Sequence, residues 1–425
     1  MRFTSPAVVS CALTLALAAY PASLRAQDQP PAAQAAPQVA QDPGLFPEPA
    51  PLSKALRYVE KRFGDGGDGE VKSGFYPEFG GMVTGAGWIA VGPGYRHWLF
   101  NDHLLFDTSA AVSWRFYKMA QMRLEMPKLA GDRVTVGTQL RWQDLTQVNY
   151  FGEGPDSLES DRNEYRLTST EIVGYTSLKA RPWLTLDSRA GFLGSPELRD
   201  STGPFRRGIP QTSEVFPNDP VFQLEEQPSF AYGAVSVIAD TRDTPGHPSR
   251  GGLYRAALST FADQGQDTFS FHRTDIEAAH FIPAAPNFVL ALRGWLVTSH
   301  PLDGHSVPFY LQPSLGGANT LRGYSNYRFH DNNLLVLNAE GRVAIFTHVD
   351  AALFVEAGNV APRVGGLNLD RTSYGVGVRL HSRGSTMARL DVAHSGEGWQ
   401  VLFRTTDPFR SSRHARRTAP VPFTP

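Results

Sequence analysis

The sequence predicts an all-β chain that forms a transmembrane antiparallel β-barrel, and three observations support this prediction. From Gly74 onward, apolar and polar residues alternate with the two-residue period of a β-strand. The alternating stretches are about ten residues long, which is enough for a strand to cross a bilayer. An apolar targeting signal at the N-terminus takes the chain out of the cytoplasm. The seven tryptophans are spread along the chain, as the aromatic girdles of a membrane barrel require.

The composition excludes several other classes of protein. Of 425 residues, 41% are hydrophobic and 19% charged, which excludes a disordered chain, and the single cysteine excludes a disulfide scaffold. The formal charge of −1 provides no basic field for holding nucleic acid. The only helix-like apolar run, residues 12–19, is shorter than the roughly 20 residues that cross a bilayer as a helix, so a multi-helix membrane protein is excluded.

Two segments precede the predicted barrel. Residues 1–26 fit a secretory signal peptide, with a basic start, an apolar centre and small residues before the cleavage region. Residues 27–72 are predicted to form a Pro/Ala-rich linker with a short amphipathic helix, whose apolar face comprises Leu52, Leu56, Val59 and Phe63. Two interpretations of this helix stay open, because it can dock on the following domain or act only as a spacer.

Residues 73–409 form the predicted barrel, and the stretch from Val349 to Gly358 shows the pattern most clearly. One face carries only apolar side chains, whereas the other face carries Asp350 and Glu356. A soluble sandwich would bury the apolar face, whereas a membrane barrel turns it toward lipid and keeps the charged face in the lumen. The signal peptide and the spread of tryptophans favour the barrel.

Fifteen strands can be assigned directly from the alternation. Because bacterial barrels have an even number of strands, we expect a sixteenth, and we place it between residues 194 and 228. The assigned strands are 83–97, 104–115, 117–126, 133–148, 164–178, 182–193, 229–239, 251–262, 270–282, 288–299, 334–346, 349–360, 373–382, 386–395 and 399–409.

The long connection before residue 334 carries the most specific motif. It reads Leu-Gly-Gly-Ala-Asn-Thr-Leu-Arg-Gly-Tyr over residues 315–324 and ends in Arg322, Gly323 and Tyr324. This segment resembles the in-folded lumen loop of the BamA/TamA family, also called the bacterial surface antigen family. Further matches are a turn with Asp240, Arg242 and Asp243, the acidic strand positions Glu340 and Glu356, and an aromatic residue at the end of the terminal strand, Phe409.

The resemblance implies a charged latch inside the barrel. A guanidinium group carried into a lumen needs carboxylate partners, and the planar arginine fork suits them. In the family the tip arginine bonds acidic groups from two strands, which corresponds here to Arg322 as the latch and Glu340 and Glu356 as its partners.

Two departures from the family pattern limit this comparison. The linker is too short and too rich in proline for a POTRA module, so we expect a short form of the family without such modules. The chain also continues past Phe409, and we predict that residues 410–425 form a basic, disordered tail outside the barrel.

The resemblance implies an integral outer-membrane protein that assists insertion or translocation of outer-membrane or exported components. The implied partners are the lipid bilayer and unfolded polypeptides, and nucleic acid is excluded. The sequence has no Gly-x-Ser-x-Gly, His-Glu-x-x-His or Gly-Lys-Ser/Thr motif, so we expect no enzyme, cofactor or metal site. Alternative functions are a passive or structural pore and an outer-membrane lipase, which His381-Ser382 and His394-Ser395 weakly suggest.

Overall fold

The computed structural model describes most of the chain from residue 44 onward. The described ranges are 44–51, 53–54, 73–80, 90–205, 208–219, 221–382, 384–409, 417–419 and 421–423. The predicted signal peptide, the apolar face of the predicted linker helix and Trp88 lie outside these residues. Within the described ranges, no helix is long and apolar enough to cross a membrane.

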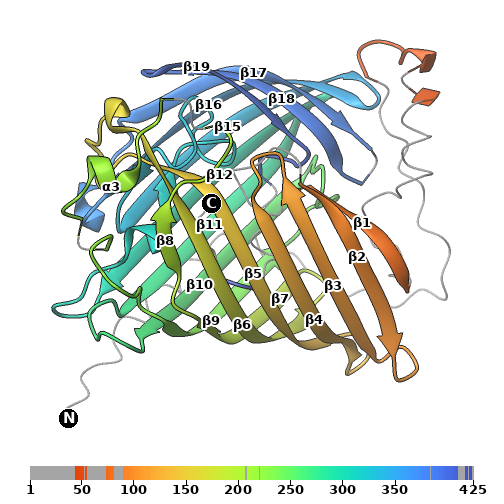
Figure 1. Ribbon diagram of the computed structural model, residues 1–425. Helices are drawn as coiled ribbons and strands as arrows, with labels where there is room; N and C mark the ends of the chain where they lie inside the picture. The colour runs from red at the N-terminus through yellow and green to blue at the C-terminus, as the bar shows by residue number, and fades with distance from the viewer. Residues whose placement is uncertain are drawn as a thin grey trace. The chain divides into compact units, whose positions relative to one another are not determined.

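The described residues form one antiparallel sheet in which each main strand pairs with the next (Figure 1). In chain order the main strands are β1 (Gly74–Gly80), β2 (Ala90–Leu99), β3 (Leu104–Ser113), β4 (Lys118–Leu129), β5 (Val134–Tyr150), β6 (Asn163–Arg181), β7 (Leu184–Leu193), β9 (Phe230–Asp240), β10 (Gly251–Asp263), β11 (Phe271–Ala285), β12 (Phe288–Pro301), β15 (Asn333–Phe346), β16 (Val349–Ala361), β17 (Arg371–His381), β18 (Thr386–Ser395) and β19 (Gly398–Arg404).

Short elements occupy the connections. The strand β8 (Glu197–Asp200) pairs with β6 beyond the end of β7. In the long connection after β12, the strands β13 (Ser314–Leu315) and β14 (Phe329–His330) pair with each other. The helical elements are α3 (Thr212–Val215), η1 (Glu159–Asp161), η2 (Phe309–Leu311) and η3 (Val364–Gly366).

The predicted barrel of sixteen strands is confirmed, but one strand lies elsewhere than expected. The large sheet has 17 strands among the described residues, and β8 shares its partner β6 with β7, which leaves sixteen in the meander. The additional strand is β1, before the first predicted strand, whereas residues 194–228 contribute only the short β8. The prediction missed β1 because Pro77 interrupts a seven-residue segment with no clear alternation.

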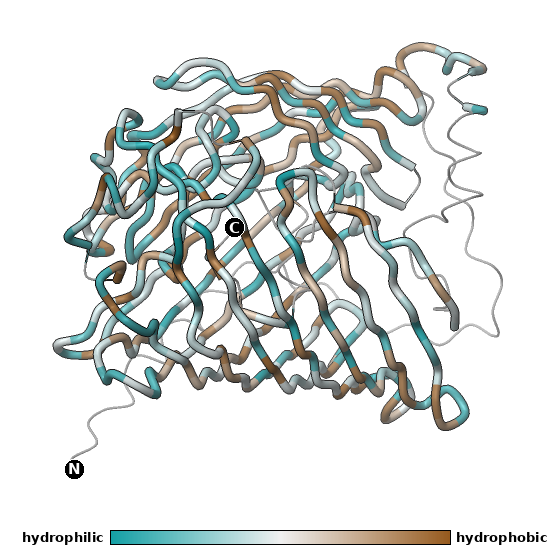
Figure 2. Tube along the Cα trace, in the orientation of Figure 1, coloured by the Kyte–Doolittle hydropathy of each residue, from teal (hydrophilic) through white to brown (hydrophobic). Residues whose placement is uncertain are grey.

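The two faces of the sheet are arranged as in a membrane barrel. In β16, Leu353 and Val355 are 65% and 57% exposed, whereas Asp350 and Glu356 are only 4% and 5% exposed. Figure 2 shows the same alternation of hydrophobic and hydrophilic residues along many strands. A soluble sandwich would have the opposite arrangement, so the outward apolar face is the lipid-facing one.

Several of the described tryptophans are exposed on the outer face, as the girdle prediction requires, but Trp295 is not. Trp114 and Trp399 are 69% and 66% exposed on the outer surface. Trp295 is fully buried, and its indole N–H donates to Asp275 Oδ1 at 2.8 Å. The girdle assignment is therefore wrong for Trp295, whose side chain lies on the inner face, where its polar nitrogen has a carboxylate partner.

The connection from β12 to β15, residues 302–332, folds back into the barrel as predicted. Leu315, Leu321 and Phe329 of this loop are fully buried and cluster with Trp295 of β12. The sharp turn of the loop uses Gly316 and Gly317, whose φ angles of +113° and +96° suit glycine.

The described residues after β19 also lie inside the barrel, which corrects two predictions. Strand β19 ends at Arg404, and Phe409 does not end a strand: it is buried and packs against Phe281 of β11, with ring centroids 6.0 Å apart. The ion pair of Asp407 with Arg342, at 2.9 Å, holds the chain on the inner wall.

The described part of the predicted outer tail is likewise buried in the barrel. Ala419 and Val421 belong to one interior hydrophobic cluster and Phe423 to another. The tail prediction, which rested on the basic composition of residues 410–425, is wrong for these residues because their apolar side chains and backbone groups find partners in the lumen.

Residues 44–51 dock beside the turn between β15 and β16. The N–H groups of Leu45 and Phe46 each donate at 3.0 Å, to the carbonyls of Ala344 and Ile345. Glu48 lies 2.7 Å from the His348 ring. This part of the predicted linker is therefore attached to the barrel.

The outward apolar face generates a test of the barrel orientation. We expect Leu353→Arg to destabilise the folded protein by about 2–4 kcal/mol, the cost of a charge on the lipid face near the bilayer midplane. The control is Leu158→Arg, because Leu158 is similarly exposed, at 60%, but lies in a loop. Urea titrations of the protein in lipid vesicles measure both. Equal effects of the two substitutions would contradict the orientation.

Candidate functional site

The tip of the lumen loop carries an arginine that is held by two strands. Arg322 is 1% exposed, and its Nη1 lies 2.7 Å from Glu340 Oε2 of β15. Its Nε lies 2.7 Å from Glu356 Oε1 of β16, and its backbone N–H donates to the other oxygen of Glu356 at 2.6 Å. The structure thus brings together the three residues that the resemblance selected, with Glu356 fixing both the side chain and the backbone of the tip.

The glycine and the tyrosine of the motif fit the tip against the strands. A Cβ on Gly323 would lie 2.8 Å from the backbone of His394 and from the side chain of Ser373, so only glycine allows this approach. The carbonyl of Gly323 accepts a hydrogen bond from Ser395 Oγ at 2.7 Å. Tyr324 packs on Phe329, with ring centroids 5.5 Å apart.

The arginine belongs to a larger buried set of charges, which we call the charge network. Its guanidinium groups are those of Arg322, Arg342, Arg379 and Arg389, and its carboxylates are those of Glu340, Glu356, Asp391 and Asp407. The four positive and four negative charges balance. All eight side chains are at most 2% exposed.

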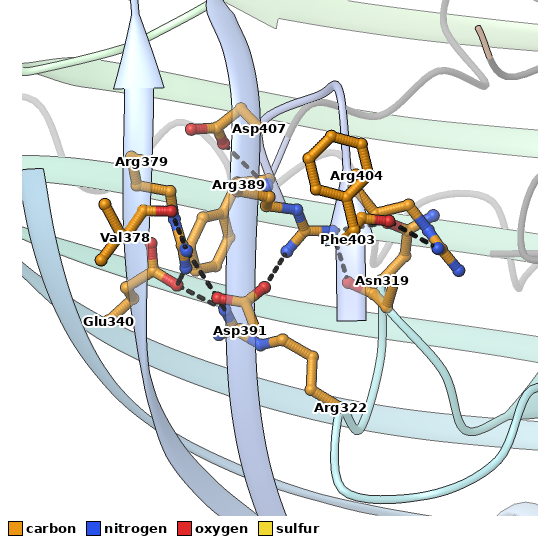
Figure 3. A network of polar contacts seen from close by, with 12 residues as sticks. Asn319, Arg322, Glu340, Val378, Arg379, Arg389, Asp391, Phe403, Arg404 and Asp407 are labelled. Atoms are coloured by element: carbon orange, nitrogen blue, oxygen red, sulfur yellow. Dashed lines mark hydrogen bonds and ion pairs between the residues drawn. The ribbon is translucent and has the colours of Figure 1, made fainter. Parts of the chain in front are cut away.

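Two carboxylates connect most of this network. Glu340 lies 2.7 Å from Arg322, 2.9 Å from Arg342 and 2.9 Å from Arg379. Asp391 lies 2.5 Å from Arg379, 3.0 Å from Arg389 and 3.5 Å from Arg322. Figure 3 shows both carboxylates beside the guanidinium groups of Arg379, Arg389 and the loop residue Arg322.

The strand register explains why Asp391 is needed. Arg379 of β17 and Arg389 of β18 are directly opposite each other in the sheet, an arrangement in which like charges repel. Asp391 uses one oxygen for each of these arginines and so turns a repulsive pair into a bridged one. Arg389 also donates to the carbonyl of Ala318 at 2.8 Å, which links this bridge to the loop.

Electrostatics keeps the latch arginine charged. Burial alone would lower the pKa of the Arg322 guanidinium, but the carboxylates of Glu356, Glu340 and Asp391 raise it above its ordinary value. Its guanidinium carbon also lies 3.4 Å from the centroid of the Phe354 ring. A permanently charged group of this kind holds the loop through electrostatics and offers no proton for catalysis.

The predicted turn motif lies apart from the latch and stabilises a different connection. Arg242 forms a two-bond fork with Asp240, at 2.8 and 2.7 Å. Asp243 accepts hydrogen bonds from the backbone N–H groups of Thr244 and Ser249, at 2.8 and 3.0 Å. These contacts shape the turn between β9 and β10.

The same turn docks on the distant turn between β17 and β18. The carbonyl of Gly246 accepts a hydrogen bond from the N–H of Thr386 at 3.0 Å. His247 lies 3.1 Å from Asp350, which also lies 3.3 Å from His381. The turn therefore joins the ends of β16, β17 and β18.

These last three residues are the potential metal ligands among the described residues, with donor atoms within 4.8 Å of one another. The rings of His247 and His381 are stacked, with centroids 3.7 Å apart and planes inclined by 10°. A cation in the plane of one ring would lie well outside the plane of the other, which is unfavourable for imidazole ligands. The arrangement instead suits a polar clamp on the turn, in which His247 also contacts Thr386 Oγ1 at 3.1 Å.

Five members of the charge network were not selected from the sequence: Arg342, Arg379, Arg389, Asp391 and Asp407. Four of them could have been found from the alternation, because each occupies a position on the charged face of its strand. Asp407 lies beyond the last strand and carries no such signal.

The latch generates a stability test. We expect Arg322→Ala to leave Glu340 and Glu356 without their shared partner and to cost about 3 kcal/mol or less, because lumen water solvates part of the released charge. The folded form should disappear from gels after heating to a lower temperature than for the parent. Protease should cleave the 302–332 loop faster. The control is Arg363→Ala, which removes an exposed arginine. Unchanged heat resistance and cleavage would contradict the latch.

Comparison with known proteins places this architecture in a family. The Omp85 superfamily domain matches residues 107–395, which confirms the resemblance to outer-membrane assembly barrels. BamA from Haemophilus ducreyi lacking POTRA domains 1–3 is similar in fold, with a TM-score of 0.59 and 15% identity over 79% of this chain and 71% of that chain. CdiB from Escherichia coli has a TM-score of 0.51 and 11% identity over 77% of this chain and 61% of that chain. No curated protein sequence matches the chain. Because the family match covers more than half of its residues, the chain belongs to the Omp85 superfamily and is a β-barrel of the outer membrane.

Proposed function

We propose that this barrel assists the insertion or translocation of unfolded outer-membrane or exported polypeptides. The observation that carries the proposal is the Omp85 domain over residues 107–395 together with a lumen loop whose tip motif is held by the charge network. The resemblance to the BamA/TamA family supports the same class of substrate. The bilayer supplies the second partner, because the apolar face of the sheet points outward.

The segments held inside the lumen argue against a passive pore. The loop occupies the interior with Arg322, Tyr324 and Phe329, and the end of the chain adds Phe409 and Phe423. A solute pore needs an open, water-filled lumen. A barrel that handles polypeptides needs only a path that opens when a client arrives.

The contacts of the two His-Ser pairs give no support to the lipase alternative. Ser395 donates to the carbonyl of Gly323 on the inner side, whereas the neighbouring His394 ring packs on the outward Trp399, with centroids 4.7 Å apart. Ser382 bonds the backbone of its own turn, and His381 faces Asp350 and His247. Both serines thus bond backbone groups, whereas a nucleophile needs its hydroxyl against the nitrogen of its base.

Reconstitution tests the proposed function. Vesicles that contain the protein should accelerate the insertion of an unfolded small outer-membrane barrel compared with empty vesicles and with vesicles that contain an unrelated porin. Acquisition of heat-resistant mobility by the client measures the rate. A passive pore would raise solute leakage without changing client insertion, and that result would contradict the proposal.

A further inference from the structure

The described residues near the C-terminus are bound to the lumen wall mainly through their backbone. The N–H of Ala419 donates to Glu171 Oε1 of β6 at 2.7 Å, and Gln143 of β5 donates to the carbonyl of Val421. Phe423 is bound at both of its backbone groups. Its N–H donates to the carbonyl of Tyr310 at 2.9 Å, and its carbonyl accepts a bond from Ser314 Oγ, also at 2.9 Å.

The carbonyls before Ala419 are bound in the same way. Arg189 of β7 donates through Nη1 to the carbonyls of Arg417 and Thr418, at 3.2 and 3.3 Å. The wall groups therefore come from three neighbouring strands and from the lumen loop. Together they follow the chain over the described residues 417–419 and 421–423.

Side-chain contacts of the segment are fewer and less specific. The Thr418 hydroxyl accepts a hydrogen bond from Arg141 at 2.9 Å. The Phe423 ring stacks on Trp295 at a centroid distance of 6.3 Å and lies 4.6 Å from the guanidinium carbon of Arg273. An aromatic or aliphatic side chain of many kinds would fit such an environment. Binding through the main chain provides affinity without demanding one sequence, as in strand-addition complexes.

The wall residues are built for a partner of this kind. Gln143, Glu171 and Ser314 are at most 5% exposed. Buried polar groups that lose a hydrogen-bond partner are costly, so a polar wall of this depth requires an occupant or water. A small cavity of about 40 Å³ remains beside Thr418, Phe423 and the wall.

We propose that these lumen residues form a binding track for the main chain of a polypeptide, and that the described residues 417–419 and 421–423 occupy this track until a client displaces them. The track, as we use the term, comprises Gln143, Glu171, Arg189, Tyr310 and Ser314. The inference deepens the proposed function, on which it rests for the identity of the client. It specifies that the ligand is bound through its main chain and that recognition tolerates different side chains.

The sequence of the segment suits this role. Prolines stand at positions 420, 422 and 425, and proline removes a backbone donor and restricts the backbone. The donors that the track uses belong to Ala419 and Phe423, which are not prolines. A resident whose backbone proline restricts binds with a smaller loss of conformational entropy.

The first arm of the test changes the full-length chain. Ala419→Pro with Phe423→Pro removes both backbone donors, whereas the control Ala419→Ser with Phe423→Leu keeps them. The proline variant should show higher conductance in planar bilayers and faster proteolysis of a C-terminal epitope, and the control should behave like the parent. Heat-dependent mobility on gels verifies that each variant is folded. A folded proline variant with parental conductance and proteolysis would overturn the proposal.

The second arm adds synthetic peptides to the proline variant. A peptide with the sequence of residues 417–425 should block the conductance, and so should a peptide in which the residues other than proline are permuted. Methylation of the two amide nitrogens at 419 and 423 should weaken the block roughly 25-fold, the loss expected for two backbone hydrogen bonds. A block by the native sequence alone would overturn the track, because it would show a plug that recognises side chains.

These measurements separate the track from the proposed function, since neither arm uses an inserting client. Peptide block without client insertion in the vesicle assay would retain the track and reject the assembly role. Client insertion without peptide block would retain the assembly role and reject the track.

Discussion

The carboxylate of Glu340 lies within 2.9 Å of three guanidinium groups, and the interior of this barrel is organised around that contact. Its partners are Arg322 of the loop, Arg342 of the same strand and Arg379 from β17. Burying charges costs several kcal/mol for each ion unless each one is paired and hydrogen-bonded. The network meets this requirement through equal numbers of guanidinium and carboxylate groups, so the loop, the strands and the chain end are held as one unit.

This arrangement lets one barrel hold two segments inside its lumen. The loop is attached through Arg322 and the end of the chain through Asp407, and the two attachments are linked by Glu340 and Arg342. The contacts differ in kind. The loop and Asp407 are held by charge, whereas the described residues 417–419 and 421–423 are held mainly through backbone hydrogen bonds. A segment held in the second way is the easier one to exchange for another polypeptide.

Much of the sheet could be predicted from the sequence because a strand needs only its two-residue period. Residues 334–346 and 349–360 were expected as strands and are observed as Asn333–Phe346 and Val349–Ala361. Contacts across the lumen have no such local signal. The alternation places Arg379 and Asp391 on the inner face but does not show that they lie beside each other. Nothing in the basic composition of the tail indicates that Val421 and Phe423 find buried partners.

The central claim is that charge balance within the network holds the interior together, and a double-mutant cycle tests it most directly. Asp391→Asn leaves Arg379 and Arg389 facing each other, and Arg389→Gln in the same chain removes one of these two charges. Urea titrations in lipid vesicles give the free energy of unfolding of the parent, both single variants and the double variant. The account predicts that the double variant is more stable than Asp391→Asn alone, with a coupling of about 1–3 kcal/mol. If the two losses simply add, the balance of charges is not what holds the interior, and the account is contradicted.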